Sequence, residues 1–257
     1  MAPRGLKTML KKSAPARLCT WKGRACFRLV EQNQATDKLR GITKRLQHSV
    51  WSSGTLPLIA RKADPRAGGH WGGKKGGQTR GTRVDAQLTK LINAGPAAWK
   101  NTNHVYRLTK MVLSGLHANG LEPVLAQRPV ASKLYKLGTA ADIVCYSKAD
   151  NSLYLIEIKT GYDHGRKAAA LLGGQECKMQ APLHKAADCN VHRHLAQLAV
   201  TWRLFSKEVG IARKLEELGL EGTVKAALLY ANDAGVELFP MSSWWERRGL
   251  PLLKALR

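Results

Sequence analysis

The chain has 257 residues, of which 42 are Lys or Arg and 18 are Asp or Glu, so its formal net charge is +24. A charge this far from neutral is typical of proteins that bind a polyanion, and 44% hydrophobic residues exclude a basic tail that is disordered throughout. No apolar run reaches about 18 residues, which excludes a membrane-spanning helix. The five cysteines are irregularly spaced and follow no secretory signal, so we expect a reducing intracellular compartment.

The positive charge is concentrated in the first third of the chain. Residues 1–83 contain 19 basic and three acidic residues, a net charge of +16, whereas residues 84–257 carry a net charge of +8. Seven glycines crowd residues 67–81, a density that disfavours any regular element. We therefore expect residues 1–80 to form a basic, Gly-rich, partly disordered arm that binds nucleic acid, with a short helical piece near residues 36–47. Residues 81–257 are expected to form one domain.

The first 30 residues contain no acid and carry scattered Arg and Lys. This pattern is shared by phosphate-binding tails and by mitochondrial presequences, and we favour the tail.

The spacing of apolar residues predicts alternating helices and strands from residue 82 onward. Apolar stripes with helical period indicate two helices, and three strand-like runs follow them, the last two joined by a tight turn. A polar loop, a third long helix, two more strands and a short Trp-rich segment complete the chain. The expected helices are 82–93, 103–119 and 192–208, and the expected strands are 123–130, 140–146, 153–159, 224–230 and 236–239.

The second and third strands contain the residues most informative about chemistry. Asp142 lies near the start of one strand, and Glu157 and Lys159 lie at the end of the next. Residues two apart in a strand face the same side, and a hairpin brings Asp142 alongside them. Carboxylates gathered in an apolar neighbourhood repel one another and need a cation. Hard oxygen ligands of this kind favour Mg²⁺ or Mn²⁺.

Taken together, the motifs GTAAD (138–142) and E-I-K (157–159) resemble the PD-(D/E)XK phosphodiesterase superfamily, and the RecB-like and lambda-exonuclease-like branch in particular. The resemblance covers about residues 80–240. It implies an α/β fold with a restriction-endonuclease-like αβββαβ core around a mixed central sheet. The proline of the family name is absent, since Ala141 precedes Asp142.

Three further positions are similar to supporting residues of that family. Asp85 lies in the opening helix, Glu122 precedes the first core strand, and Gln197 lies in a glutamine motif on the helix that follows E-x-K. The resemblance implies a Mg²⁺-dependent (or Mn²⁺-dependent) deoxyribonuclease that acts in DNA recombination, repair, replication or genome processing. Asp142, Glu157 and the Ile158 carbonyl would hold the metal, and Lys159 would orient or activate water.

Basic residues around this core are the expected contacts to DNA phosphates, with RNA as a possible substrate instead. The residues expected in this role are Lys74, Lys75, Arg80, Arg83, Arg166 and Lys167. A DNA-binding enzyme of this kind is expected in the nucleus or another DNA-containing compartment, a virus or a mitochondrion included.

Two alternatives stay open at this point. The first is a non-catalytic DNA-binding or packaging protein that uses a retired nuclease fold. The second is a zinc site built from the group Cys177, His184, Cys189, His192 and His194. That group has no C-x-x-C knuckle, and we therefore favour no structural metal there.

Overall fold

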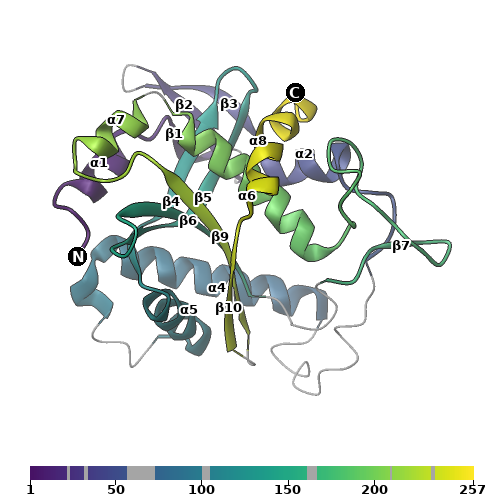
Figure 1. The fold of residues 1–257 in the computed structure, drawn as a ribbon, viewed down its shortest axis with the longest axis horizontal. Coiled ribbons are helices and arrows are strands. Elements are labelled where there is room, and N and C mark those ends of the chain that lie inside the picture. The colour runs from purple at the N-terminus through teal and green to yellow at the C-terminus, as the bar shows by residue number, and fades with distance from the viewer. Residues whose placement is uncertain are drawn as a thin grey trace.

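The computed structural model describes residues 1–21, 24–31, 34–56, 73–99, 105–160, 167–208, 210–232 and 235–257. Within these residues the protein is a mixed α/β structure with helices on both faces of a mixed sheet (Figure 1). The strand order in the sheet is β1-β2-β3-β5-β6-β9-β10, with β4 paired to β5 off this path. The predicted α/β class is therefore confirmed.

Five strands of the sheet are those expected from the sequence. Their bounds are β4 (Leu121–Ser132), β5 (Leu137–Ser147), β6 (Ser152–Lys159), β9 (Val224–Asn232) and β10 (Gly235–Pro240). The pairs β4–β5, β5–β6 and β9–β10 are antiparallel, and β6–β9 is parallel. The parallel pair is possible because a long helical crossover separates β6 from β9.

The two faces of the sheet carry separate apolar cores because alternate residues of a strand point to opposite sides. Helices α4 (Gly73–Ala94) and α5 (Arg107–Ala118) cover one face. Helices α6 (Asn190–Ser206) and α8 (Ser243–Ala255) cover the other. On β5, Ile143 packs with the first pair of helices and Val144 with the second.

The glycine-rich segment departs from its prediction. Helix α4 begins at Gly73, well before the expected start at residue 82, and it runs through four glycines to Ala94. The expectation of an irregular segment up to residue 81 is therefore wrong from Gly73 onward. From Val84 the helix buries an apolar stripe against the sheet, and this packing extends a helix whose N-terminal part has a weak intrinsic propensity.

Most of residues 1–56, which were expected to lie in a partly disordered arm, form regular elements in the structure. The elements found there are α1 (Leu6–Lys12), β1 (Ala16–Trp21), β2 (Arg24–Glu31), β3 (Gln34–Gly41) and α2 (Ile42–Ser49). Residues expected to be helical near 36–47 are divided between β3 and α2. Residues 57–72, with Trp71, lie outside the described residues.

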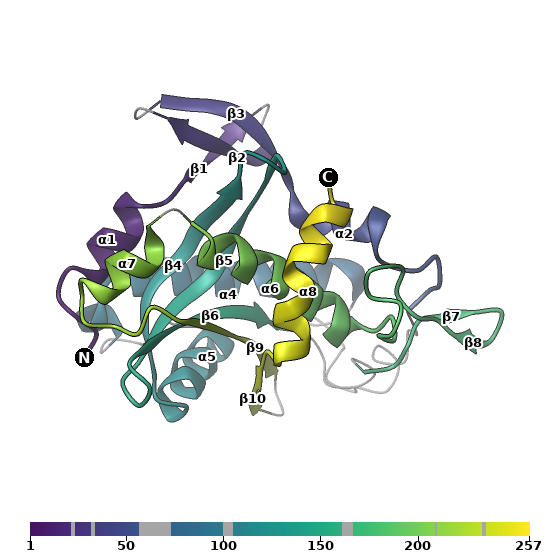
Figure 2. The ribbon, with the colours of Figure 1, turned by 45° about the horizontal axis from the view of Figure 1, so that its top comes forward.

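Tertiary burial explains why this region is ordered. Leu6, Leu10, Ile42 and Leu46 are almost completely buried in the core that α6 and α8 also line. Each pair is spaced by four residues, which is one turn of helix, but a single turn is too short to stand out in a sequence. Strand β3 then joins β5 in parallel at Gly41 and Gly138, so the N-terminal strands extend the sheet (Figure 2).

The remaining elements lie outside the central sheet. Helix α7 (Ile211–Glu216) and the 3-10 turn η3 (Pro96–Trp99) were not expected, and the Trp-rich C-terminal segment is the full helix α8. The loop after β6 contains the short hairpin β7 (Leu171–Leu172) and β8 (Gln175–Glu176), which projects from the body of the protein (Figure 2). None of the helices within the described ranges is long and apolar enough to cross a membrane.

Helices α6 and α8 approach closely at Gly249. A Cβ atom there would lie 2.9 Å from the carbonyl oxygen of Ala199 and 2.9 Å from Cβ of Arg203. We predict that Gly249→Ala destabilises the protein by about 1–3 kcal/mol, the usual cost of overpacking. Urea denaturation measures the change, with Gly41→Ala as the matched control, because open space surrounds Gly41. Equal effects of the two substitutions would contradict this account of the helix packing.

Candidate active site

The site lies where β6 separates from β5. The two strands pair from Ser147–Ser152 to Ile143–Ile156, and the next position would place Asp142 opposite Glu157. Beyond this point β6 pairs only with β9, up to Lys159 and Tyr230. The Ile158 N–H therefore donates to the Oδ2 atom of Asp142, at 2.9 Å, instead of continuing the strand ladder. The separation exposes the end of β6 to a cavity while Asp142 fixes its backbone.

Glu157 is the most enclosed group of the site. Its Oε1 atom accepts hydrogen bonds from Lys159 Nζ at 2.5 Å and from Gln197 Nε2 at 2.7 Å. The residue is 1% exposed, and its Oε2 atom has no hydrogen-bond partner among the described residues. A buried carboxylate oxygen without a partner is costly. Protein groups thus hold one oxygen of Glu157, while the other oxygen is buried and has unused hydrogen-bonding or metal-binding capacity.

A second carboxylate and an amide come from neighbouring elements. Gln127 on β4 lies opposite Asp142, and its Nε2 atom donates to Asp85 Oδ1 at 2.7 Å and to Asp142 Oδ1 at 3.4 Å. Asp85, Gln127, Asp142 and Lys159 all line one cavity of about 390 Å³. The left-handed backbone of Gln127, with φ of 53°, sets its side chain toward these acids. Sequence reasoning missed Gln127, since only its polarity within an apolar strand marks it.

The charged groups of the site shift one another's pKa values. Burial, then the charge of Asp142, raises the pKa of Glu157 to about 7 against the pull of Lys159. Burial also raises the pKa of Asp142, and burial and Asp142 together raise the pKa of Asp85. Burial lowers the pKa of Lys159, but Glu157, Asp142 and Asp85 outweigh it and raise that pKa overall. Three carboxyl groups thus share one ammonium ion, and an excess of negative charge remains when all are ionised.

Oxygen atoms make up this donor set, and it fits a hard divalent cation. Mg²⁺ is commonly held by one or two carboxylates, with water and phosphate oxygens as its other ligands. The unpartnered Glu157 Oε2 and the neighbouring Asp142 provide such a pair, and Ile158 lines the same cavity. Within the described ranges no group of three or more His, Cys, Asp or Glu side chains is arranged to hold a metal by itself.

The structure therefore brings together six residues of the predicted site, which are Asp85, Asp142, Glu157, Ile158, Lys159 and Gln197. Glu122 is not among them. It pairs with Tyr146 near the far end of β4, where its carboxylate accepts a hydrogen bond from the Ala2 N–H at 2.8 Å. The expectation that Glu122 supports the site is wrong, because Glu122 lies five positions before Gln127, the residue that does face Asp142.

The expected phosphate contacts are dispersed. Arg80 is buried and donates to the carbonyl of Thr160, which makes it a structural residue rather than a phosphate contact. Arg83 lies over the ring of Tyr106, and Lys167 lies 5.7 Å from the centre of the Phe239 ring. Arg166 and the side chains of Lys74 and Lys75 lie outside the described part of the chain.

The cysteine and histidine residues near α6 have other partners. His192 Nδ1 is 2.7 Å from the Ala187 carbonyl, and His194 Nδ1 is 2.6 Å from the Tyr230 hydroxyl. Hydrogen bonding to Cys189 raises the pKa of His192. These contacts attach the start of α6 to the sheet and to the preceding loop.

No protein-family model and no curated protein sequence matches this chain.

The shifted pKa of Glu157 predicts how stability depends on pH without metal. A carboxyl group in an unfolded chain has its ordinary pKa near 4.5, so between about pH 4.5 and 7 the folded state binds more protons than the unfolded state. The free energy of unfolding should therefore fall as pH rises through this window. We predict that Glu157→Gln flattens this dependence.

Urea denaturation in EDTA from pH 5 to pH 8 measures the effect. Glu217→Gln is the control, because that carboxylate is exposed on the surface. If Glu157→Gln and wild type keep a constant difference in unfolding free energy across the range, the proposed proton uptake is excluded.

Proposed function

We propose that this protein is a metal-dependent deoxyribonuclease that hydrolyses DNA phosphodiester bonds. The observation that carries the proposal is the convergence of Asp142, Glu157 and Lys159 at the point where β6 leaves β5, with one oxygen of Glu157 unpartnered. These residues carry the PD-(D/E)XK resemblance. Their spatial proximity supports a common chemical role beyond that of a surface ion pair.

Asp142, Glu157 and the Ile158 carbonyl are the groups that would hold Mg²⁺ or Mn²⁺. A bound divalent ion supplies a nucleophile at neutral pH and stabilises charge on the phosphate. The Ile158 N–H holds Asp142 Oδ2, and Gln197 holds Glu157 Oε1, so both carboxylates are oriented before a metal binds. Such positioning by neighbouring donors is what makes a metal site specific in geometry.

Lys159 is the residue that would act on the attacking water and the phosphate. Its side chain is 22% exposed and lines the cavity, while the ion pair with Glu157 fixes its ammonium group. The raised pKa keeps Lys159 protonated at neutral pH, so in this state it donates hydrogen bonds and stabilises negative charge. Gln127 links Asp85 to Asp142 and positions both acids at the cavity wall.

The net charge of +24 supports a nucleic acid as the substrate. Binding should depend on phosphate contacts and weaken strongly as salt concentration rises. DNA is the substrate implied by the resemblance, and an RNA of the same sequence is the comparison that tests this choice.

Lys159→Ala should lower the rate of DNA cleavage in Mg²⁺ by about 10²- to 10⁴-fold, the range for loss of one positioned catalytic group. Purified wild type and variant are compared on end-labelled linear and supercoiled circular DNA, with a matched RNA in parallel. Lys148→Ala is the control, because Lys148 is an exposed lysine in the β5–β6 turn. Equal cleavage by Lys159→Ala and wild type would refute the proposal, and binding without cleavage by wild type would favour a non-catalytic DNA-binding protein.

Mg²⁺ should stabilise the folded protein through the same carboxylates. A ligand that binds only the folded state at 100 times its Kd adds about 2.7 kcal/mol to the free energy of unfolding. We therefore predict that Mg²⁺ raises the unfolding temperature of wild type and that this rise is lost in Glu157→Gln. A rise of the same size in both proteins would place the metal elsewhere.

A further inference from the structure

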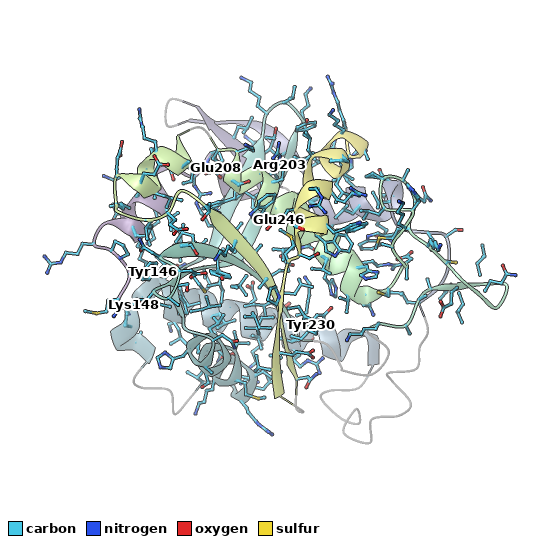
Figure 3. All side chains as sticks on the ribbon, viewed as in Figure 1. Tyr146, Lys148, Arg203, Glu208, Tyr230 and Glu246 are labelled. Carbon is cyan, nitrogen blue, oxygen red and sulfur yellow. The ribbon has the colours of Figure 1, made fainter. Side chains whose placement is uncertain are left out.

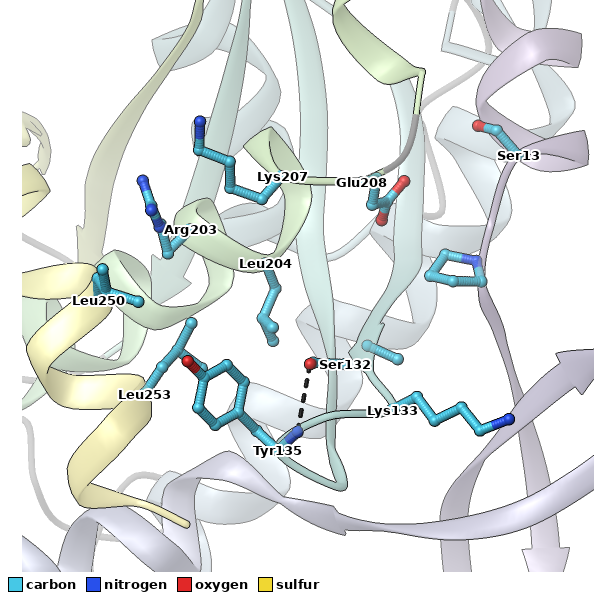
Figure 4. Close-up of a pocket in the computed structure, with 12 residues that line it drawn as sticks. Ser13, Ser132, Lys133, Tyr135, Arg203, Leu204, Lys207, Glu208, Leu250 and Leu253 are labelled. Carbon is cyan, nitrogen blue, oxygen red and sulfur yellow. Dashed lines mark hydrogen bonds between the residues drawn. The ribbon is translucent and has the colours of Figure 1, made fainter.

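A second cavity lies at the C-terminal end of α6, whereas the active site contacts the middle of this helix through Gln197. It has a volume of about 470 Å³, within the range of pockets that bind small organic ligands (Figure 4). The turn between β4 and β5 forms one wall, and the C-terminal end of α6 together with α8 forms another. Arg203 lies six residues, or about 1.7 turns, beyond Gln197, so the two side chains leave α6 on different faces.

Three cations line this cavity. Arg203 in the last turn of α6 and Lys207, which caps that helix, are four residues apart and extend in the same direction, and Lys133 lies on the opposite wall. A single acid lines it, Glu208, and Arg128 binds both of its carboxylate oxygens at 2.7 and 2.6 Å. Because this buried pair cancels its own charge, Arg203 and Lys207 make their side of the cavity positive.

Apolar and aromatic groups lie beside the cations. Leu204 and Leu253 are almost completely buried and line the cavity, and Tyr135 stands against them. The Tyr135 N–H donates to Ser132 Oγ at 3.3 Å, which orders the backbone of the turn that carries the ring (Figure 4). A flat aromatic ring near cations is the combination that binds a base by stacking and its phosphate by charge.

We propose that this cavity binds a nucleoside phosphate, with the base against Tyr135 and the leucines and the phosphate against Arg203 and Lys207. The same chemistry is offered by a free nucleotide and by one nucleotide of a single strand, and experiment separates these two sources. The inference does not rest on the proposed nuclease function, because it requires neither a metal nor cleavage.

The cavity is separate from the cleavage site along the sheet as well as along α6. Ser132 lies five residues beyond Gln127 on β4, about 17 Å at the rise of a strand. Figure 3 places Arg203 and Glu208 close together, away from Lys148 at the far end of the β5–β6 hairpin. Lys148 therefore offers a matched site for charge reversal outside the cavity.

Two probes are measured in EDTA, so that no cleavage takes place. Calorimetry follows binding of thymidine monophosphate, and fluorescence anisotropy follows binding of a labelled eight-residue oligothymidylate. Four proteins are compared. They are wild type, the cavity double variant Arg203→Glu/Lys207→Glu, the single variant Tyr135→Ala, and the double variant Lys148→Glu/Lys44→Glu. The last variant is the control, since both of its lysines are exposed and lie outside the cavity, and its net charge equals that of the double variant.

We expect Arg203→Glu/Lys207→Glu to bind the probes at least tenfold more weakly than the control does. Tyr135→Ala should weaken it about fivefold or more, because stacking of one base contributes about 1–3 kcal/mol. Loss of oligonucleotide binding assigns the cavity to a nucleotide within a strand, whereas loss of mononucleotide binding alone assigns it to a free nucleotide. Binding of both probes equal to that of the control overturns the proposal.

Thermal unfolding of each variant shows whether it is folded. If charge reversal unfolds the protein, the variant Arg203→Gln/Lys207→Gln replaces it, because glutamine removes the charge but keeps a polar side chain with an aliphatic chain. Its binding is compared with that of the same control. Cleavage by wild type and Lys159→Ala is measured separately in Mg²⁺, so a failed binding result and a failed nuclease result are distinguishable.

Discussion

The arrangement of the site depends on one constraint, which is that β5 has two successive partners on the same edge. At its start the edge pairs with β3, and from Ile143 onward it pairs with β6. Between these two pairings the edge makes no backbone ladder with either strand, and Asp142 lies there with its side chain bonded to the Ile158 N–H. The acids can meet a ligand because backbone pairing is interrupted at this point, while a side chain replaces one of the missing hydrogen bonds.

Sequence could predict the order of the central elements and the pairing of Asp142 with the E-x-K strand. The register of a hairpin is set by local turn chemistry and by the alternation of side chains between the two faces of a strand. The role of Gln127 could not be predicted, because it depends on the left-handed backbone of Gln127 itself and on the register of β4. That register shifts between Pro123 and Leu125. Glu122 was misplaced for the same reason. The N-terminal strands were missed because their burial comes from distant partners, which periodicity does not reveal.

The buried pair Arg128–Glu208 shows the same dependence on distant partners. Arg128 follows Gln127 directly, and its side chain points to the other face, where it also donates to the Leu10 carbonyl and lies over the Phe205 ring. The side chain of Arg128 is fully buried, a state that charged residues reach only when paired. Neighbouring residues of one strand thus take part in two different polar networks, one at the acidic cavity and one beside the basic cavity.

The parallel pairing of β3 with β5 has a consequence for the order of folding. Arg40 meets Leu137 across almost a hundred residues of intervening chain, and Gly138 leaves no room for a side chain between Phe27 and Leu39. Contacts between residues so far apart form late, since a long loop must close before they contribute. The β1–β3 strands are synthesised before β5, so they can complete the sheet only after β5 has been made. Until then the edge of β3 that pairs with β5 has no partner in the sheet.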